Sequence, residues 1–143
     1  MSNYKDIANY PVVISEKVRL SDTDRQGHVN NVSFSFFFEA GRSAVVLETH
    51  DLLDPGCFFV IVATSIEFLG ELNWPGHVEI ANGVEKVGNS SITVRQALFQ
   101  DGRCAATSNS TMVQVNIAQK ANQPLSERAK ALLATMSYRS EAA

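Results

Sequence analysis

The spacing of apolar residues divides this chain into one strand, a long helix and a row of further strands. Apolar and polar side chains alternate over residues 12–20, a pattern typical of a strand. Over residues 32–48 the apolar side chains recur at helical spacing and extend well around the cylinder, which predicts a mostly buried helix. Further strands are expected at residues 57–69, 78–87, 91–100 and 103–117, and a short helix at residues 127–136.

The later strands are joined mostly by short turns. Asp101-Gly102 stands between two strand-like runs and predicts a type I′ hairpin, a turn that needs positive φ at both central residues. Short connections of this kind imply antiparallel pairing. A helix followed by a row of strands is an α+β order. We therefore expect an antiparallel sheet that curves around one long central helix, with residues 1–143 forming a single domain.

Composition narrows the classes of function. Hydrophobic residues make up 45% of the chain and charged residues 19%, as in globular proteins. The net charge is −3 and there is no block of Lys or Arg, so we expect no nucleic-acid partner. The chain shows neither a signal-peptide pattern nor an apolar run of ~20 residues, so we expect a cytoplasmic protein without membrane contact. Cys57 and Cys104 are expected to be free thiols outside any zinc motif, and we expect no metal or cofactor.

The polar segment of residues 21–31 is the most unusual part of the sequence. It contains Asp22, Asp24, Gly27, His28 and two asparagines directly before the predicted helix. A helix N-terminus offers unpaired backbone N–H groups and a partial positive charge, which can hold the oxygen of a polarised carbonyl. A glycine lets a substrate approach the backbone closely, and a nearby carboxylate can act as a general base or a nucleophile.

This segment, SDTDRQGHVNN, together with FFFEAGR at residues 36–42, resembles the signature of the hotdog-fold acyl-CoA thioesterases, the 4-hydroxybenzoyl-CoA thioesterase-like proteins. The similarity extends over nearly the whole chain. It implies hydrolysis of an acyl-CoA to the free acid and the CoA thiol, without a metal. By this resemblance Asp24 is the nucleophile or general base. The turn containing Gly27, His28, Asn30 and Asn31 leads into the central helix, whose backbone N–H groups polarise the thioester carbonyl.

The resemblance also implies partners and a second set of contacts. Such enzymes work as homodimers or homotetramers, with the acyl group at the interface between two subunits. Lys86, Ser90 and Ser91 lie where members of the family contact the CoA phosphates.

The sequence departs from the family pattern at Asn31, where the enzymes that act on aromatic substrates carry an aromatic residue. The HVNN ending is more similar to acyl-CoA and acyl-carrier-protein thioesterases, some of which depend on Asn and His. Whether Asp24 works alone or with His28 and Asn30 stays open. A non-catalytic hotdog protein that binds an acyl or aromatic ligand is an alternative, because one fold hosts several functions. A hotdog dehydratase or hydratase is disfavoured because the sequence does not show their His-centred motif.

The remaining polar residues are expected to be structural. Asp22 is typical of a turn residue that bonds the backbone, and Asn30 or Asn31 is expected to cap the helix. Glu39 and Arg42 are three residues apart on the helix, so we expect an ion pair between them. His50 and His77 are expected on the surface.

Overall fold

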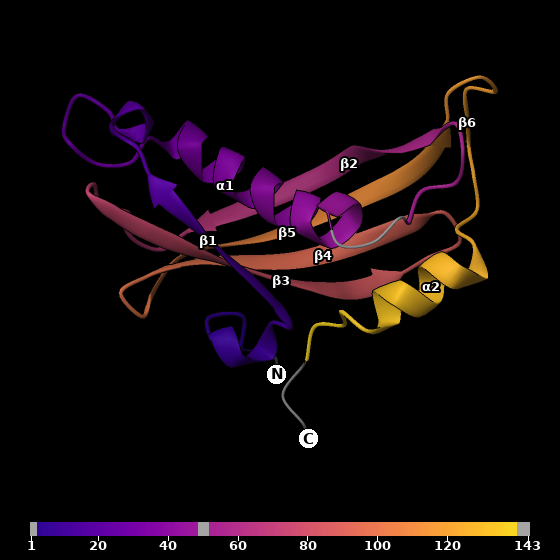
Figure 1. The fold of residues 1–143 in the computed structure, drawn as a ribbon. Helices are drawn as coiled ribbons and strands as arrows, with labels where there is room; N and C mark the ends of the chain where they lie inside the picture. The colour runs from indigo at the N-terminus through magenta and orange to yellow at the C-terminus, as the bar shows by residue number, and fades with distance from the viewer. Residues whose placement is uncertain (1–2, 49–51, 140–143) are drawn as a thin grey trace.

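The computed structural model describes residues 3–48 and 52–139 (Figure 1). The predicted strands and helices are confirmed to within a few residues. A short strand and two 3-10 turns were not predicted. In chain order the elements are a 3-10 helix at Ile7–Asn9, β1 (Val12–Val18), a 3-10 helix at Leu20–Asp22, α1 (Asn31–Ser43), a π-helical turn at Ala44–Glu48, β2 (Cys57–Phe68), β3 (Gly76–Val87), β4 (Ser91–Gln100), β5 (Arg103–Asn116), β6 (Ala121–Asn122) and α2 (Glu127–Ala134).

The strands form one antiparallel sheet in the order β1-β3-β4-β5-β2, and β6 pairs with β5 beside this path. The sheet curves around α1, as Figure 1 shows. Asp101 and Gly102 have φ values of 52° and 77°, which confirms the hairpin expected between β4 and β5. The structure therefore has the predicted α+β hotdog fold, with a curled antiparallel sheet around a long helix. Its two edges are β1 and β2.

The helix α1 is buried on one side only. Phe34, Phe37 and Phe38 pack into the concave face of the sheet, with 3%, 6% and 0% of their surface exposed. Val32 and Phe36 are 61% and 62% exposed. The prediction of a mostly buried helix is thus wrong for a single chain, because the curled sheet covers only one side of the cylinder. A large apolar surface of α1 remains uncovered.

A buried pair of amide side chains lies between α1 and the sheet. Asn82 on β3 and Gln96 on β4 are opposite each other in the register and fully buried. The Gln96 Nε2 donates to the Phe38 carbonyl at 2.8 Å and to Asn82 Oδ1 at 2.7 Å. A Cβ on Gly41 would overlap Asn82 Oδ1 and lie 2.6 Å from Gln96 Nε2. The absence of a side chain at Gly41 therefore lets the helix reach this polar pair.

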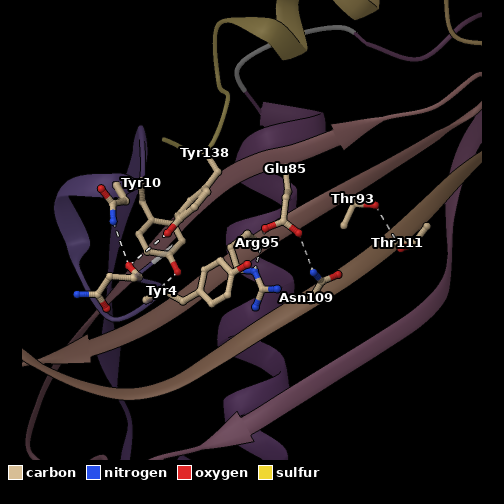
Figure 2. A network of polar contacts seen from close by, with 10 residues as sticks. Tyr4, Tyr10, Glu85, Thr93, Arg95, Asn109, Thr111 and Tyr138 are labelled. Carbon is tan, nitrogen blue, oxygen red and sulfur yellow. Dashed lines mark hydrogen bonds and ion pairs between the residues drawn. The ribbon is translucent and has the colours of Figure 1, made fainter. Parts of the chain in front are cut away.

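The opposite face of the sheet is partly covered by the N-terminal segment. Arg95 neighbours Gln96 on β4, so it points away from α1. Its guanidinium lies 3.7 Å from the centroid of the Tyr4 ring, and its Nε is 3.4 Å from Glu85 Oε2 (Figure 2). The Asn109 Nδ2 donates to Glu85 Oε1 at 3.1 Å. This network connects the N-terminal segment to β3, β4 and β5.

Two further tyrosines join both ends of the chain to this network. The Tyr10 hydroxyl donates to the Tyr4 carbonyl at 2.7 Å, and the Tyr138 hydroxyl donates to the Asn3 carbonyl at 3.2 Å. The Tyr10 and Tyr138 rings pack edge to face, with centroids 5.0 Å apart. Burial raises the pKa of both phenols above the usual value of 10.0.

The C-terminal helix α2 begins as predicted, because the Ser126 Oγ accepts from the Ala129 N–H at 3.0 Å. Leu133 of α2 is fully buried in a second apolar cluster with Val94 and Ile92 of β4. Among the described residues, no helix is both long and apolar enough to cross a membrane.

Candidate active site

The loop between β1 and α1 is held in place by Asp22. This residue is buried, with 6% of its surface exposed. Its Oδ2 accepts from the Arg19 N–H at 2.8 Å, and its carbonyl accepts from the Asn30 N–H at 2.8 Å and the Ser33 Oγ at 3.2 Å. The bond of its side chain to a backbone N–H confirms the structural role predicted for Asp22, and its carbonyl in addition connects the beginning of the loop to its end.

Asp24 is exposed and lies in the middle of this loop. Its Oδ1 accepts from the backbone N–H groups of Gln26 at 2.8 Å and His28 at 3.3 Å. Its own N–H donates to the His28 carbonyl at 2.8 Å, and its carbonyl accepts from the Gly27 N–H at 3.2 Å. Within residues 3–48 and 52–139, the Oδ2 atom has no hydrogen-bond partner. One carboxylate oxygen therefore orients the side chain, and the other is open to solvent.

Among the residues that the structure describes, the first turn of α1 leaves one backbone donor without an acceptor. Asn30 is the N-cap: its Oδ1 accepts from the Val32 N–H at 2.9 Å, and its carbonyl accepts from the Ser33 N–H at 2.9 Å. The Asn30 N–H is taken by Asp22. Asn31 follows, and its N–H has no hydrogen-bond partner in the described part of the chain. The expected cluster of free N–H groups at this helix end is therefore reduced to that of Asn31.

His28 is brought next to a residue that the sequence did not point to. Its Nε2 lies 3.3 Å from Glu71 Oε2, and both side chains are substantially exposed. A backbone bridge between His28 and Asn73 and a hydrogen bond from the Val29 N–H to the Leu72 carbonyl join the loop to the segment after β2. Glu71 is distant from the loop in the sequence, so no local pattern could have identified it.

Lys86, Ser90 and Ser91 lie at the other end of the sheet. Lys86 is exposed, and it lines a cavity of about 590 Å³ between the β3–β4 turn and α2, together with Asn89 and Lys130. Sequence analysis did not single out Lys130. From Gly76, at the loop end of β3, to Lys86 the strand extends by roughly 33 Å. The structure therefore does not bring these residues near Asp24 within one chain.

The predicted ion pair between Glu39 and Arg42 is not formed among the described residues. The Arg42 Nη1 instead donates to Gln96 Oε1 at 3.4 Å, because the buried amide pair presents an acceptor on that side of α1. Burial lowers the pKa of the Arg42 guanidinium, and the charge of Glu39 counteracts this shift. His77 is exposed as predicted, whereas His50 lies outside the described residues.

The comparison with protein families places this loop and sheet in a known context. The model of the thioesterase-like superfamily matches residues 18–133, which include the loop, α1 and β2–β5. The chain belongs to the thioesterase-like superfamily. Membership of this superfamily supports thioester hydrolysis as the general chemistry of the protein. No curated protein matches the sequence.

Solved structures confirm the thioesterase-like fold. A protein of Pseudomonas aeruginosa strain PAO1 is 26% identical, with a TM-score of 0.82 over 95% of this chain and 96% of that chain. A Thermus thermophilus thioesterase complexed with coenzyme A and Zn is 22% identical, with a TM-score of 0.73 over 87% of this chain and 98% of that one. A gentisyl-coenzyme A thioesterase is 21% identical, with a TM-score of 0.71 over 83% of this chain and 99% of that one.

Proposed function

We propose that this protein is a cytoplasmic thioesterase that hydrolyses an acyl-CoA to the free acid and the CoA thiol, with Asp24 as its general base or nucleophile. The observation that carries the proposal is the state of the Asp24 carboxylate. Two backbone N–H groups orient Oδ1, whereas Oδ2 has no partner among the described residues, and the loop that carries this carboxylate leads directly into α1. A carboxylate held in this way can take a proton from water without reorganising the loop.

The chemistry follows from the donors and acceptors at the loop. The Asn31 N–H, at the positive end of α1, donates to the thioester carbonyl oxygen and stabilises the oxyanion. Asp24 Oδ2 removes a proton from the attacking water; in the nucleophilic variant it attacks the carbonyl and forms an anhydride that water then hydrolyses. The C–S bond breaks and CoA leaves as a thiolate. In this scheme His28, whose Nε2 lies 3.3 Å from Glu71 Oε2, protonates the leaving thiolate.

We propose that the working unit is a homodimer formed through β2. This strand has 12 residues and, within the described part of the chain, pairs only with β5, so its second edge presents free backbone donors and acceptors. It is also apolar and poorly covered, since Phe58, Val62 and Phe68 are 40%, 60% and 50% exposed. A second copy that pairs along this edge would satisfy the backbone groups and bury the apolar side chains.

Such a dimer would combine the two separated parts of the site. The Phe68 end of β2 leads to Glu71 and the Asp24 loop, whereas the Cys57 end lies toward the β3–β4 turn (Figure 1). Antiparallel pairing of two β2 strands sets the Phe68 end of one copy beside the Cys57 end of the other. The Asp24 loop of one subunit would then face Lys86, Ser90 and Ser91 of the other, where the CoA phosphates bind.

The test is thiol release from a panel of acyl-CoAs and one acyl-carrier protein, with the wild type and Asp24→Asn side by side. Asparagine keeps an oxygen that can accept from Gln26 and His28, so this variant removes the charge and preserves the loop. We expect kcat to fall by about 10²–10⁴. Asp6→Asn is the matched control, because the Asp6 Oδ1 accepts from the Ala8 N–H in the same way, on a segment distant from the loop.

Two results would contradict the proposal. An Asp24→Asn variant that kept more than about a tenth of the wild-type kcat would remove Asp24 from the chemistry. A wild-type protein that released no thiol from any thioester, yet bound acyl-CoA, would be a binding protein of the same fold.

A further inference from the structure

A second cavity, of about 370 Å³, lies between the C-terminal half of α1 and β2. Its volume falls within the range of small-molecule pockets. Its walls are mainly apolar and come from the π-helical turn after α1, the segment before β2, β2 itself and β5: they include Val46, Leu47, Leu53, Phe58, Ile61 and Met112. Three polar residues of α1, namely Glu39, Arg42 and Ser43, complete the lining.

The Arg42 guanidinium is held in this cavity by the buried amide pair. Asn82 Nδ2 donates to the carbonyls of Val12 and Ile80, so its Oδ1 must face Gln96. Gln96 Nε2 then donates to that oxygen and to the Phe38 carbonyl, which leaves its Oε1 directed at Arg42. The amide orientations are thus determined by the network. Arg42 therefore faces a fully buried acceptor whose orientation the network determines.

The charge of Arg42 is poorly compensated. Its single hydrogen bond, to Gln96 Oε1, is long at 3.4 Å, and its other N–H groups have no partner among the described residues. A guanidinium has five N–H donors in a planar fork that matches a carboxylate. The side chain is half-buried, and burial lowers its pKa. Glu39 is exposed, so water screens its charge more strongly than that of Arg42.

We propose that this cavity binds an apolar chain that ends in a carboxylate, with the chain among the side chains of α1 and β2 and the carboxylate on the fork of Arg42. The apolar walls suit an apolar chain, and the poorly compensated guanidinium of Arg42 suits a negatively charged end. The ligand has two possible sources in a thioesterase: the far end of an ω-carboxyacyl substrate, or the carboxylate of the released acid. This inference rests on the proposed function for the source of the ligand, but not for its chemistry.

Direct binding tests the chemistry without any hydrolysis. Calorimetric titration of the intact protein with octanoate and with octan-1-ol compares a charged and a neutral end on the same chain. We expect octanoate to bind at least about 10-fold more tightly than octan-1-ol, and Arg42→Gln to abolish this preference. Equal affinity for the two probes in the wild type, or an unchanged octanoate affinity in Arg42→Gln, would overturn the proposal.

Glu39→Gln is a control in the same cavity, because it should change the octanoate affinity in the direction opposite to Arg42→Gln. Removing the carboxylate of Glu39 leaves Arg42 as the only charge among the described lining residues, so octanoate affinity should rise, whereas octan-1-ol affinity should not change. A fall in octanoate affinity in this variant would contradict the assignment of the carboxylate to Arg42. The unfolding midpoints of all variants show whether each retains the fold, and Arg42→Lys, which keeps the charge but loses the fork, should lie between wild type and Arg42→Gln.

Hydrolysis assays then distinguish the two sources of the ligand. From Asn31 to Arg42, α1 extends by about 17 Å, so a medium- to long-chain pair is appropriate. If Arg42 holds the far end of the substrate, kcat/KM for dodecanedioyl-CoA should exceed that for dodecanoyl-CoA, and Arg42→Gln should remove the difference. If Arg42 holds the released acid, the two kcat/KM values should be similar, and octanoate should inhibit the wild type but not Arg42→Gln. Absence of both effects would refute the inference even if the enzyme hydrolyses other thioesters.

Discussion

Because Gly41 contacts the buried amide pair, we expect its replacement by alanine to lower the free energy of unfolding, whereas this substitution in a helix usually raises it. Replacing a glycine inside a helix by alanine ordinarily stabilises the helix by about 1 kcal/mol. At Gly41 the new methyl group would overlap Asn82 Oδ1 and lie 2.6 Å from Gln96 Nε2 and 2.7 Å from Ile80 Cγ2. Both amides are fully buried and hydrogen-bonded on several sides, so neither can turn away without losing a partner.

The magnitude follows from these competing effects. Forcing a methyl group into a packed interior costs about 1–3 kcal/mol, and separating Gln96 from Asn82 costs about 1–3 kcal/mol more. After the gain in helix propensity, Gly41→Ala should lower the free energy of unfolding by about 3 kcal/mol. For a chain of this size, a slope of ~2 kcal/mol/M in urea converts this loss into a midpoint lower by roughly 1.5 M.

The assay is urea unfolding followed by circular dichroism, at one protein concentration, because an oligomer is stabilised by mass action. Ser35→Ala is the control: Ser35 lies on the exposed side of α1, where only helix propensity acts, so it should be neutral or slightly stabilising. A Gly41→Ala variant with a midpoint equal to or above that of the wild type would show that α1 does not approach the amide pair this closely.

Two further predictions concern the β2 edge and the tyrosines. Val62→Lys should convert a homodimer into a monomer in light scattering and lower thiol release, whereas Val13→Lys, on the opposite edge strand, should do neither; a dimeric Val62→Lys would contradict pairing through β2. Burial raises the pKa of Tyr10 and Tyr138 in the folded state, so the folded protein keeps these protons longer than the unfolded chain. The protonated phenols contribute fully to the free energy of unfolding below the unfolded pKa of about 10, and this contribution is lost as pH rises above that value. The free energy of unfolding should therefore fall above about pH 10. Tyrosinate absorbance in the near ultraviolet checks this: ionisation of every tyrosine near the unfolded pKa without unfolding would refute it.

The features that the sequence determined by itself are those that depend on neighbouring residues. The hairpin at Asp101-Gly102 was predictable because a type I′ turn requires positive φ at two adjacent residues. The cap of α1 was predictable to within one residue, as Asn30 or Asn31, because a capping side chain bonds an N–H within three residues of it. The row of antiparallel strands and the loop that resembles a thioesterase signature were predictable for the same reason, because each depends on residues that are adjacent in the sequence.

Tertiary structure alone decided which groups meet across the sheet. Arg42 bonds to Gln96 on β4 and not to Glu39, its neighbour on the helix. The reason is that Asn82 fixes the orientation of Gln96, whose Oε1 then lies beneath that side of α1. His28 met Glu71 through the pairing of the loop with the segment after β2. The same pairing and capping occupied the N–H groups around the loop, so that Asn31 alone kept a free donor at the start of α1 within the described chain. These contacts join residues far apart in the chain, and local spacing carries no information about them.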